Sequence, residues 1–129
     1  KPADIYEVFK NNYLQNRPVF DITECHFRQI DGIEACVSLS HGDKVTQVIS
    51  KGNGRLDAVS NALKAYFGKE YTLSCYEQHA LTQGSRSKAI SYVGVEADGS
   101  MFFGAGVDDD IITSSYKALV SAVNNMLKA

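Results

Sequence analysis

The order of apolar and polar positions in the first half of the chain has the two-residue period of β-strands. Residues 33–40 alternate strictly between apolar side chains and polar or small ones, so one face of this segment is expected to be buried. Residues 19–30 and 45–50 are also rich in strand-forming residues, and turn signals separate the segments at Asp31-Gly32 and at residues 41–43. The pattern predicts three consecutive strands joined by tight turns.

A change of period after Gly52-Asn53-Gly54 predicts a helix. From there on, apolar residues recur at intervals of three or four positions, which gathers them on one helical face. Gly68 then stands where a C-cap glycine would end that helix. The expected apolar face consists of Leu56, Val59, Leu63, Tyr66 and Phe67.

The same order of elements recurs in the second half of the chain. Leu63 of the first predicted helix corresponds to Leu119 of the second, an offset of 56 positions. The sequence therefore predicts an α+β fold built from two β-β-β-α units with pseudo-twofold symmetry. A small ligand is expected to bind where the two units meet. The second set of strands is expected over residues 71–81, 89–96 and 100–106, with a hairpin signal at Asp98-Gly99 and a helix after residue 110.

Residues 1–17 lie outside this duplication. Helical spacing of the apolar residues between Asp4 and Tyr13 predicts a short helix with Asp4 as its N-cap. Pro18 marks the passage into the first strand. We expect the first repeat over about residues 18–68 and the second over about residues 69–129.

Composition indicates a cytoplasmic globular domain. Of the 129 residues, 44% are apolar and 22% are charged, and the net charge is −2. No dense cluster of Lys or Arg favours nucleic-acid binding, and no apolar run suggests a membrane span or a signal peptide. The chain begins at Lys1 without an initiator methionine, so we expect it to be a fragment.

The cysteines and histidines give no indication of catalysis. Cys25, Cys36 and Cys75 are odd in number and widely spaced, which fits free thiols in a reducing compartment and matches no zinc-ligand pattern. The three histidines are isolated, and no Ser-His-Asp or Cys-His arrangement is suggested by their positions. We therefore expect this chain to have no catalytic activity, no metal and no cofactor of its own.

The starts of the two long predicted helices differ in chemical character. A helix N-terminus leaves about four backbone N–H groups unpaired, and Gly52-Asn53-Gly54 has no acidic residue to satisfy them. Residues 108–110 are three aspartates, which can cap their own helix and still present negative charge. A zwitterion with an apolar side chain would use both entrances. Each motif alone is also compatible with ordinary capping and turn formation.

Two segments resemble the C-terminal regulatory domain of 2-isopropylmalate synthases. They are residues 52–58 (GNGRLDA) and residues 104–124 (GAGVDDDIITSSYKALVSAVN). Residues 76–80 (YEQHA) also resemble a segment of the longer form of that family. The resemblance covers nearly the whole chain and implies that residues 1–17 are the end of a linker subdomain.

The resemblance implies feedback regulation of a distant enzyme. In that family the domain is a duplicated β-β-β-α fold that dimerises and binds leucine, and citramalate synthases carry a similar domain for isoleucine. The implied parent is an acyltransferase whose metal-dependent TIM barrel, absent here, joins acetyl-coenzyme A to 2-oxoisovalerate. The expected partners are leucine or isoleucine, a second copy of the chain, and the catalytic domain of the same polypeptide. A structural dimerisation module with an empty pocket is the alternative, and a strand face bearing Met101 and Phe103 would favour dimerisation.

The resemblance also implies where the effector binds. The first helix entrance would border it, residues of the next strand would line its apolar part, and the second helix entrance would face the same pocket. At position 55 the chain departs from the family, because Arg55 replaces the usual proline and is expected to alter anion affinity. The implied residues are Gly52, Asn53, Gly54, Leu56, Asp57, Leu73, Tyr76, Ala80, Asp108, Asp109, Asp110, Ile111 and Ile112.

Overall fold

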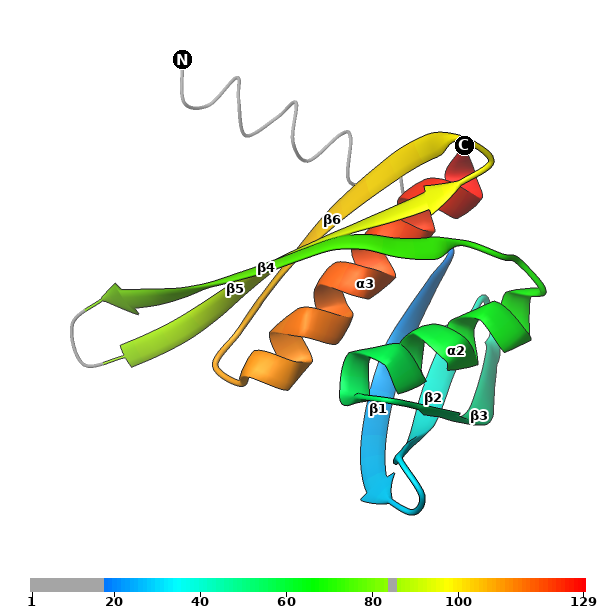
Figure 1. Ribbon diagram of the computed structural model, residues 1–129, viewed down its shortest axis with the longest axis horizontal. Helices are drawn as coiled ribbons and strands as arrows, with labels where there is room; N and C mark the ends of the chain where they lie inside the picture. The colour runs from blue at the N-terminus through cyan, green and yellow to red at the C-terminus, as the bar shows by residue number, and fades with distance from the viewer. Residues whose placement is uncertain (1–17, 84–85) are drawn as a thin grey trace.

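The chain folds into two β-β-β-α units, and the predicted α+β duplication is confirmed (Figure 1). The computed structural model describes residues 18–83 and 86–129. The helix predicted between Asp4 and Tyr13 lies outside these residues. The first unit comprises β1 (Phe20–Gln29), β2 (Ile33–His41), β3 (Lys44–Gly52) and α2 (Arg55–Phe67). The second comprises β4 (Thr72–Gln83), β5 (Arg86–Ala97), β6 (Ser100–Asp108) and α3 (Ile111–Lys128).

The 56-residue offset between the two units is carried by their C-terminal halves. Strand β3 covers residues 44–52 and β6 covers residues 100–108, so each end is displaced by that offset. The N-cap residues Gly54 and Asp110 are related in the same way. Leu63 and Leu119 are both fully buried, so equivalent positions of the two helices fill the core.

The Asp-Gly turns have the conformation that their sequence predicts. Asp31 and Gly32 have φ angles of 48° and 105°, and Asp98 and Gly99 have φ angles of 52° and 80°. Tight hairpins need this left-handed backbone because it matches the twist of the paired strands, and Asp-Gly adopts it at low cost. The strands of each sheet are accordingly antiparallel and adjacent in sequence order.

Each helix packs on the sheet of its own unit, and α3 also contacts β1 of the other unit. The buried Asn124 side chain on α3 accepts hydrogen bonds from the backbone N–H groups of Val19 and Phe20, at 2.7 and 3.1 Å. Its amide nitrogen donates to the Phe20 carbonyl at 3.0 Å. The end of the second repeat therefore fixes the start of the first, and the two units share one apolar core.

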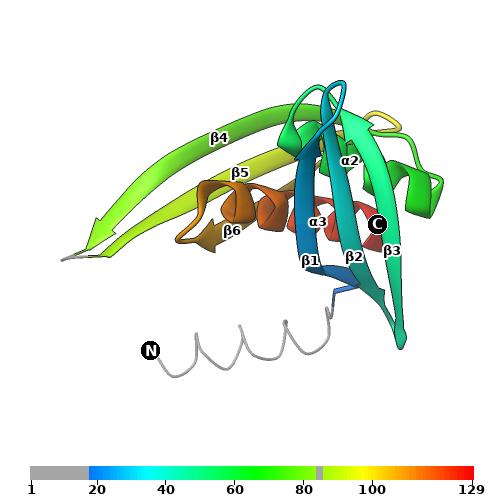
Figure 2. The same ribbon diagram turned by 90° about the horizontal axis from the view of Figure 1, so that it is seen from below.

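The two sheets face different directions around α3. Figure 2 shows the β1–β2–β3 sheet crossing the direction of the β4–β5–β6 sheet, with α3 running between them. The paired ends of β4 and β5 extend past the start of α3 in both views (Figures 1 and 2). Within the described ranges, no helix is long and apolar enough to cross a membrane.

Candidate functional site

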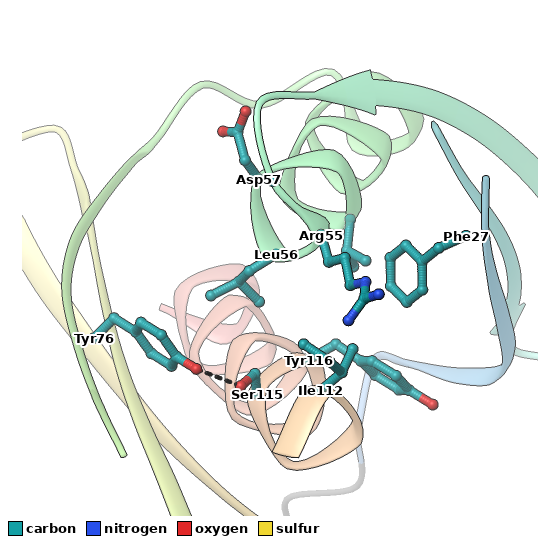
Figure 3. Close-up of a pocket in the computed structure, with 10 residues that line it drawn as sticks. Phe27, Arg55, Leu56, Asp57, Tyr76, Ile112, Ser115 and Tyr116 are labelled. Atoms are coloured by element: carbon teal, nitrogen blue, oxygen red, sulfur yellow. Dashed lines mark hydrogen bonds between the residues drawn. The ribbon is translucent and has the colours of Figure 1, made fainter. Parts of the chain in front are cut away.

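A pocket of about 300 Å³ lies at the junction of the two repeats. Its wall is formed by the first turns of α2 and α3 together with one residue each from β1 and β4 (Figure 3). This volume is at the small end of the range for ligand pockets, roughly 300–1,000 Å³. The lining residues are Phe27, Gly54, Arg55, Leu56, Asp57, Val59, Tyr76, Ile112, Ser115 and Tyr116.

Equivalent residues of the two repeats face each other across this pocket. Leu56 and Ile112 are separated by the 56-residue offset, and so are Val59 and Ser115. Equivalent positions of the two units therefore contribute to the same pocket. At the second of these pairs the first repeat supplies an apolar side chain, Val59, and the second supplies a polar one, Ser115.

The start of α2 leaves backbone donors open at the pocket. Gly54 is the N-cap, has an extended backbone (φ −145°), and carries no side chain that could cap the helix. The first helical hydrogen bond runs from the Ala58 N–H to the Gly54 carbonyl at 2.9 Å, so the N–H groups of residues 55–57 precede the helical ladder. Among the described residues no side chain accepts a hydrogen bond from them. An anionic group is the natural partner for such donors.

The expectation that no acidic residue satisfies this entrance is wrong in one respect. The Asp57 carboxylate accepts a hydrogen bond from the Asn53 N–H at 2.9 Å. Asp57 is four residues after Asn53, so its side chain reaches back over the turn that precedes the helix. In Figure 3 this carboxylate points away from the other labelled side chains of the pocket. One donor is therefore satisfied internally, and the donors of residues 55–57 are not.

Arg55 brings a positive charge to the pocket. Its guanidinium carbon lies 5.9 Å from the centre of the Phe27 ring, which is within the range of a cation–π contact. Figure 3 shows the guanidinium beside this ring and directed toward the side of α3. Within residues 18–83 and 86–129, Arg55 forms no salt bridge. The charge is therefore placed at the pocket without being neutralised.

A hydrogen-bonded network forms the opposite wall. The Tyr76 hydroxyl lies 2.6 Å from the Ser115 hydroxyl (Figure 3). The Ser115 hydroxyl donates its single proton to the Ile111 carbonyl at 2.9 Å and accepts from the Gln78 amide nitrogen at 3.1 Å. Tyr76 must then be the donor toward Ser115, because a carbonyl cannot donate. The Tyr76 oxygen keeps its capacity to accept a hydrogen bond from a ligand.

Two of the three aspartates before α3, Asp108 and Asp110, are used within their own helix start. Asp110 is the N-cap and accepts hydrogen bonds from the N–H and the hydroxyl of Thr113, at 2.9 and 2.8 Å. Asp108 accepts from Lys117 at 2.7 Å and from the Asp110 N–H at 3.0 Å, and the hydrogen bond from Lys117 is the main reason why the pKa of Asp108 is lowered. Of residues 108–112, Ile112 alone lines the pocket at the junction.

The other residues implied by the resemblance lie beside the pocket rather than in its wall. A Cβ added to Gly52 would lie 2.5 Å from the Ala58 nitrogen, so this glycine allows α2 to pack on the end of β3. Asn53 contributes its N–H to Asp57, and Leu73 packs against the core. Ala80, Asp109 and Ile111 line a second hollow of about 240 Å³ near the β4–β5 hairpin. The structure thus brings together Gly54, Leu56, Asp57, Tyr76 and Ile112.

Five lining residues were not part of the sequence-based site. Val59 could have been found because the helical period places it one turn after Leu56, and Ser115 is its counterpart at the 56-residue offset. Arg55 was noted as a departure from the family but not placed in the site. Phe27 and Tyr116 carry no comparable sequence signal. The periodicity of a strand or helix does not show which residues of that element contact the other unit.

Each of the three histidines lies near a neighbouring polar side chain among the described residues. Over these residues no group of three or more His, Cys, Asp and Glu side chains is placed to hold a metal ion. His26 and His79 lie 4.0 and 3.6 Å from the neighbouring Glu24 and Glu77. His41 lies 3.1 Å from the Tyr66 hydroxyl. None of the three histidines lines the pocket at the junction.

The fold and the pocket define a duplicated α+β domain with a small pocket at its internal junction. Residues 1–127 match the model of the LeuA allosteric (dimerisation) domain. The chain belongs to this family.

Relatives with this domain are 2-isopropylmalate synthases. The chain is 41% identical over 128 residues to the 2-isopropylmalate synthase of Desulfitobacterium hafniense. This aligned region covers 98% of the chain and 23% of the relative. It is 35% identical over 135 residues to that of Helicobacter hepaticus, covering 98% and 24%, and 37% identical over 134 residues to that of Clostridium acetobutylicum, covering 95% and 23%. The chain therefore spans about a quarter of the length of these relatives.

Proposed function

We propose that this domain binds leucine in the pocket between its two repeats and thereby inhibits a catalytic TIM barrel of the same polypeptide, in a longer protein that acts as a 2-isopropylmalate synthase. Family membership supports a regulatory role. The observation that carries the proposal is the pocket itself, which has apolar walls and an uncapped helix start and is formed by both repeats.

The lining suits the parts of a branched-chain amino acid. The α-carboxylate would lie against the open N–H groups of residues 55–57, where the helix dipole favours negative charge. The apolar side chain would contact Leu56, Val59 and Ile112, which are partly or fully buried. A nucleotide would exceed a pocket of about 300 Å³.

Regulation would follow from the ligand's contact with both repeats. A molecule held by α2 and α3 together restrains the motion of one unit against the other. Allosteric coupling is typically worth about 1–3 kcal/mol, and it can act through reduced mobility without a large change of shape. This restraint would be passed through residues 1–17 to the catalytic domain.

A second copy of the chain is the partner that we propose for the outer face of the β4–β5–β6 sheet. Helix α3 covers the inner face, whereas Phe103, Tyr92 and Val107 remain 60%, 44% and 43% exposed. Exposed apolar surface of this kind is characteristic of an interface. The dimerisation named in the family description supports this occupant over others.

Calorimetric titration of the 129-residue chain with leucine, isoleucine and valine tests the effector. We expect leucine to bind most tightly, and a Gly54→Val variant to weaken its binding by about tenfold or more because the new side chain covers the donors. This variant should fold, since a Cβ at Gly54 meets nothing within 4 Å. Asp108→Ala is the control, because Asp108 lies outside the pocket wall.

Absence of heat and of thermal stabilisation with all three amino acids would remove the sensor proposal and leave a dimerisation module. Equal affinities in Gly54→Val and the unmodified chain would move the site away from the start of α2.

A further inference from the structure

We propose that the pocket recognises its ligand mainly through the carboxylate, with Arg55 as the ion-pair partner, and that it accepts branched-chain carboxylates lacking an ammonium group. This inference rests on the proposed function, because it concerns the same pocket. It goes further in naming the ligand class as short branched carboxylic acids, of which amino acids are one kind.

The first step is the distribution of charge around the pocket. Arg55 lines it and forms no salt bridge within the described part of the chain. The acidic groups nearby are already engaged, since Asp57 accepts the Asn53 N–H and Asp108 accepts from Lys117. The pocket is thus lined by an available cation, whereas each of these carboxylates already has a donor.

The second step is the position of the guanidinium. The guanidinium carbon lies over the Phe27 ring, 5.9 Å from its centre, and a contact of this kind reduces the freedom that the long side chain must lose on binding. Its N–H groups stay available at the edge, where a carboxylate can accept two parallel hydrogen bonds. The open N–H groups of α2 begin at the same residue. One carboxylate can therefore use both sets of donors.

The third step concerns the opposite end of an amino acid. The polar groups across the pocket are the hydroxyls of Tyr76 and Ser115, which are hydrogen-bonded to each other at 2.6 Å. They offer a neutral acceptor at the tyrosine oxygen. Hydrogen bonds to charged partners contribute more than those between neutral groups, and a cation paired with neutral oxygens gains less than a carboxylate paired with arginine. Removing the ammonium group should therefore cost little affinity.

Titration of the 129-residue chain with leucine, leucinamide and 4-methylpentanoate tests the inference. Leucinamide keeps the ammonium and the side chain but has no carboxylate, whereas 4-methylpentanoate keeps the carboxylate and lacks the ammonium. We expect leucinamide to bind about tenfold more weakly than leucine or worse, and 4-methylpentanoate to bind within about threefold of leucine.

Variants assign the effect to Arg55. Arg55→Gln should weaken both carboxylates by about tenfold and leave leucinamide unchanged. Arg28→Gln is the matched control, because Arg28 is an exposed arginine next to Phe27 in β1 whose side chain lies 3.9 Å from Glu34.

The outcomes separate the inference from the proposed function. If neither leucine nor 4-methylpentanoate binds the unmodified chain, the proposed function fails. If leucine binds but 4-methylpentanoate does not, the ammonium is essential and the inference is overturned. Unchanged leucine affinity in Arg55→Gln overturns the role of Arg55 while leaving the proposed function in place.

Discussion

At the scale of single residues, Tyr71 shows how a buried hydroxyl is accommodated. Its side chain is 5% exposed and exchanges hydrogen bonds with Ser60: it accepts from the serine hydroxyl at 3.0 Å and donates to the serine carbonyl at 3.1 Å. Burial raises the pKa of Tyr71 to about 12, against an ordinary value of 10.0. The folded chain therefore holds this proton more tightly than the unfolded chain does.

This difference predicts a loss of stability at alkaline pH. The contribution of Tyr71 is fully present below pH 10 and is lost as the pH rises toward 12, because only the unfolded state releases the proton easily in that window. Two pKa units correspond to about 3 kcal/mol. In a Tyr71→Phe variant, the free energy of unfolding measured by urea denaturation should fall less between pH 10 and 12 than in the unmodified chain. Parallel curves would contradict this assignment.

The amino acids at the pocket also limit what could be inferred from the sequence. The glycine motif correctly indicated a helix start with open donors, because Gly54 has no side chain to cap it. The acidic motif was read as facing the ligand, but side-chain direction depends on local partners. Asp110 has Thr113 three residues ahead and Asp108 has Lys117 nearby. These contacts form within the helix start and have no counterpart in hydrophobic periodicity.

At the scale of secondary-structure elements, α3 packs closely on β6 at two glycines. A Cβ added to Gly104 would lie 2.2 Å from the Ala122 nitrogen, and one added to Gly106 would lie 2.4 Å from the Ser114 carbonyl oxygen. Both obstacles are helix backbone, which cannot move independently of α3. The two glycines therefore set the distance between the helix and the sheet.

Gly106→Ala should destabilise the domain through this contact. The added methyl group forces α3 away from β6, and overpacking of this kind typically costs about 1–3 kcal/mol. Urea denaturation of the variant measures the loss. Gly54→Ala is the comparison, since its methyl group meets nothing within 4 Å and should cost only about 0.5 kcal/mol as a poorer N-cap. Similar losses in both variants would argue against close packing as the cause.

The elements themselves were predictable because strand and helix periods differ and because Asp-Gly and Gly punctuate them. The α+β duplication, the Asp-Gly turns and the end of α2 at Gly68 follow from these signals. The reach of β4 and β5 past the start of α3 did not follow, and neither did the crossing of the two sheets (Figure 2). Such features depend on contacts between units, for example Asn124 with the start of β1, and a one-dimensional pattern does not encode them.

At the scale of the whole molecule, the two sheets expose different outer faces. The row that crosses the β4–β5–β6 sheet at Gly94 places Cys75 and Phe103 on either side of it. The corresponding row of the β1–β2–β3 sheet, at the 56-residue offset, joins Glu24, Ser38 and Gln47. The outer face of the β4–β5–β6 sheet is the more apolar of the two along these rows, and we expect a second copy of the chain to cover it.

A Phe103→Glu variant tests this arrangement. A charge at the centre of an apolar interface is costly to bury, so sedimentation should show the dimer shifting toward monomer by at least about tenfold in dissociation constant. Ile49→Glu is the control, because Ile49 is similarly exposed, at 63%, on the other sheet. A shift caused by Ile49→Glu and not by Phe103→Glu would place the interface on the β1–β2–β3 sheet and contradict this prediction.

The near-symmetry of the pocket has a consequence for how many molecules it holds and in which pose. If the two repeats were identical, a ligand on their common axis could lie in either of two equivalent orientations. Arg55 corresponds to Ile111, which lies outside the pocket wall, and Val59 corresponds to Ser115, so only the start of α2 offers a cation to the anionic end of a ligand. Divergence after duplication would thus leave the proposed ligand a single pose and one site per chain, and we expect a pair of chains to pass through a half-filled state before saturation.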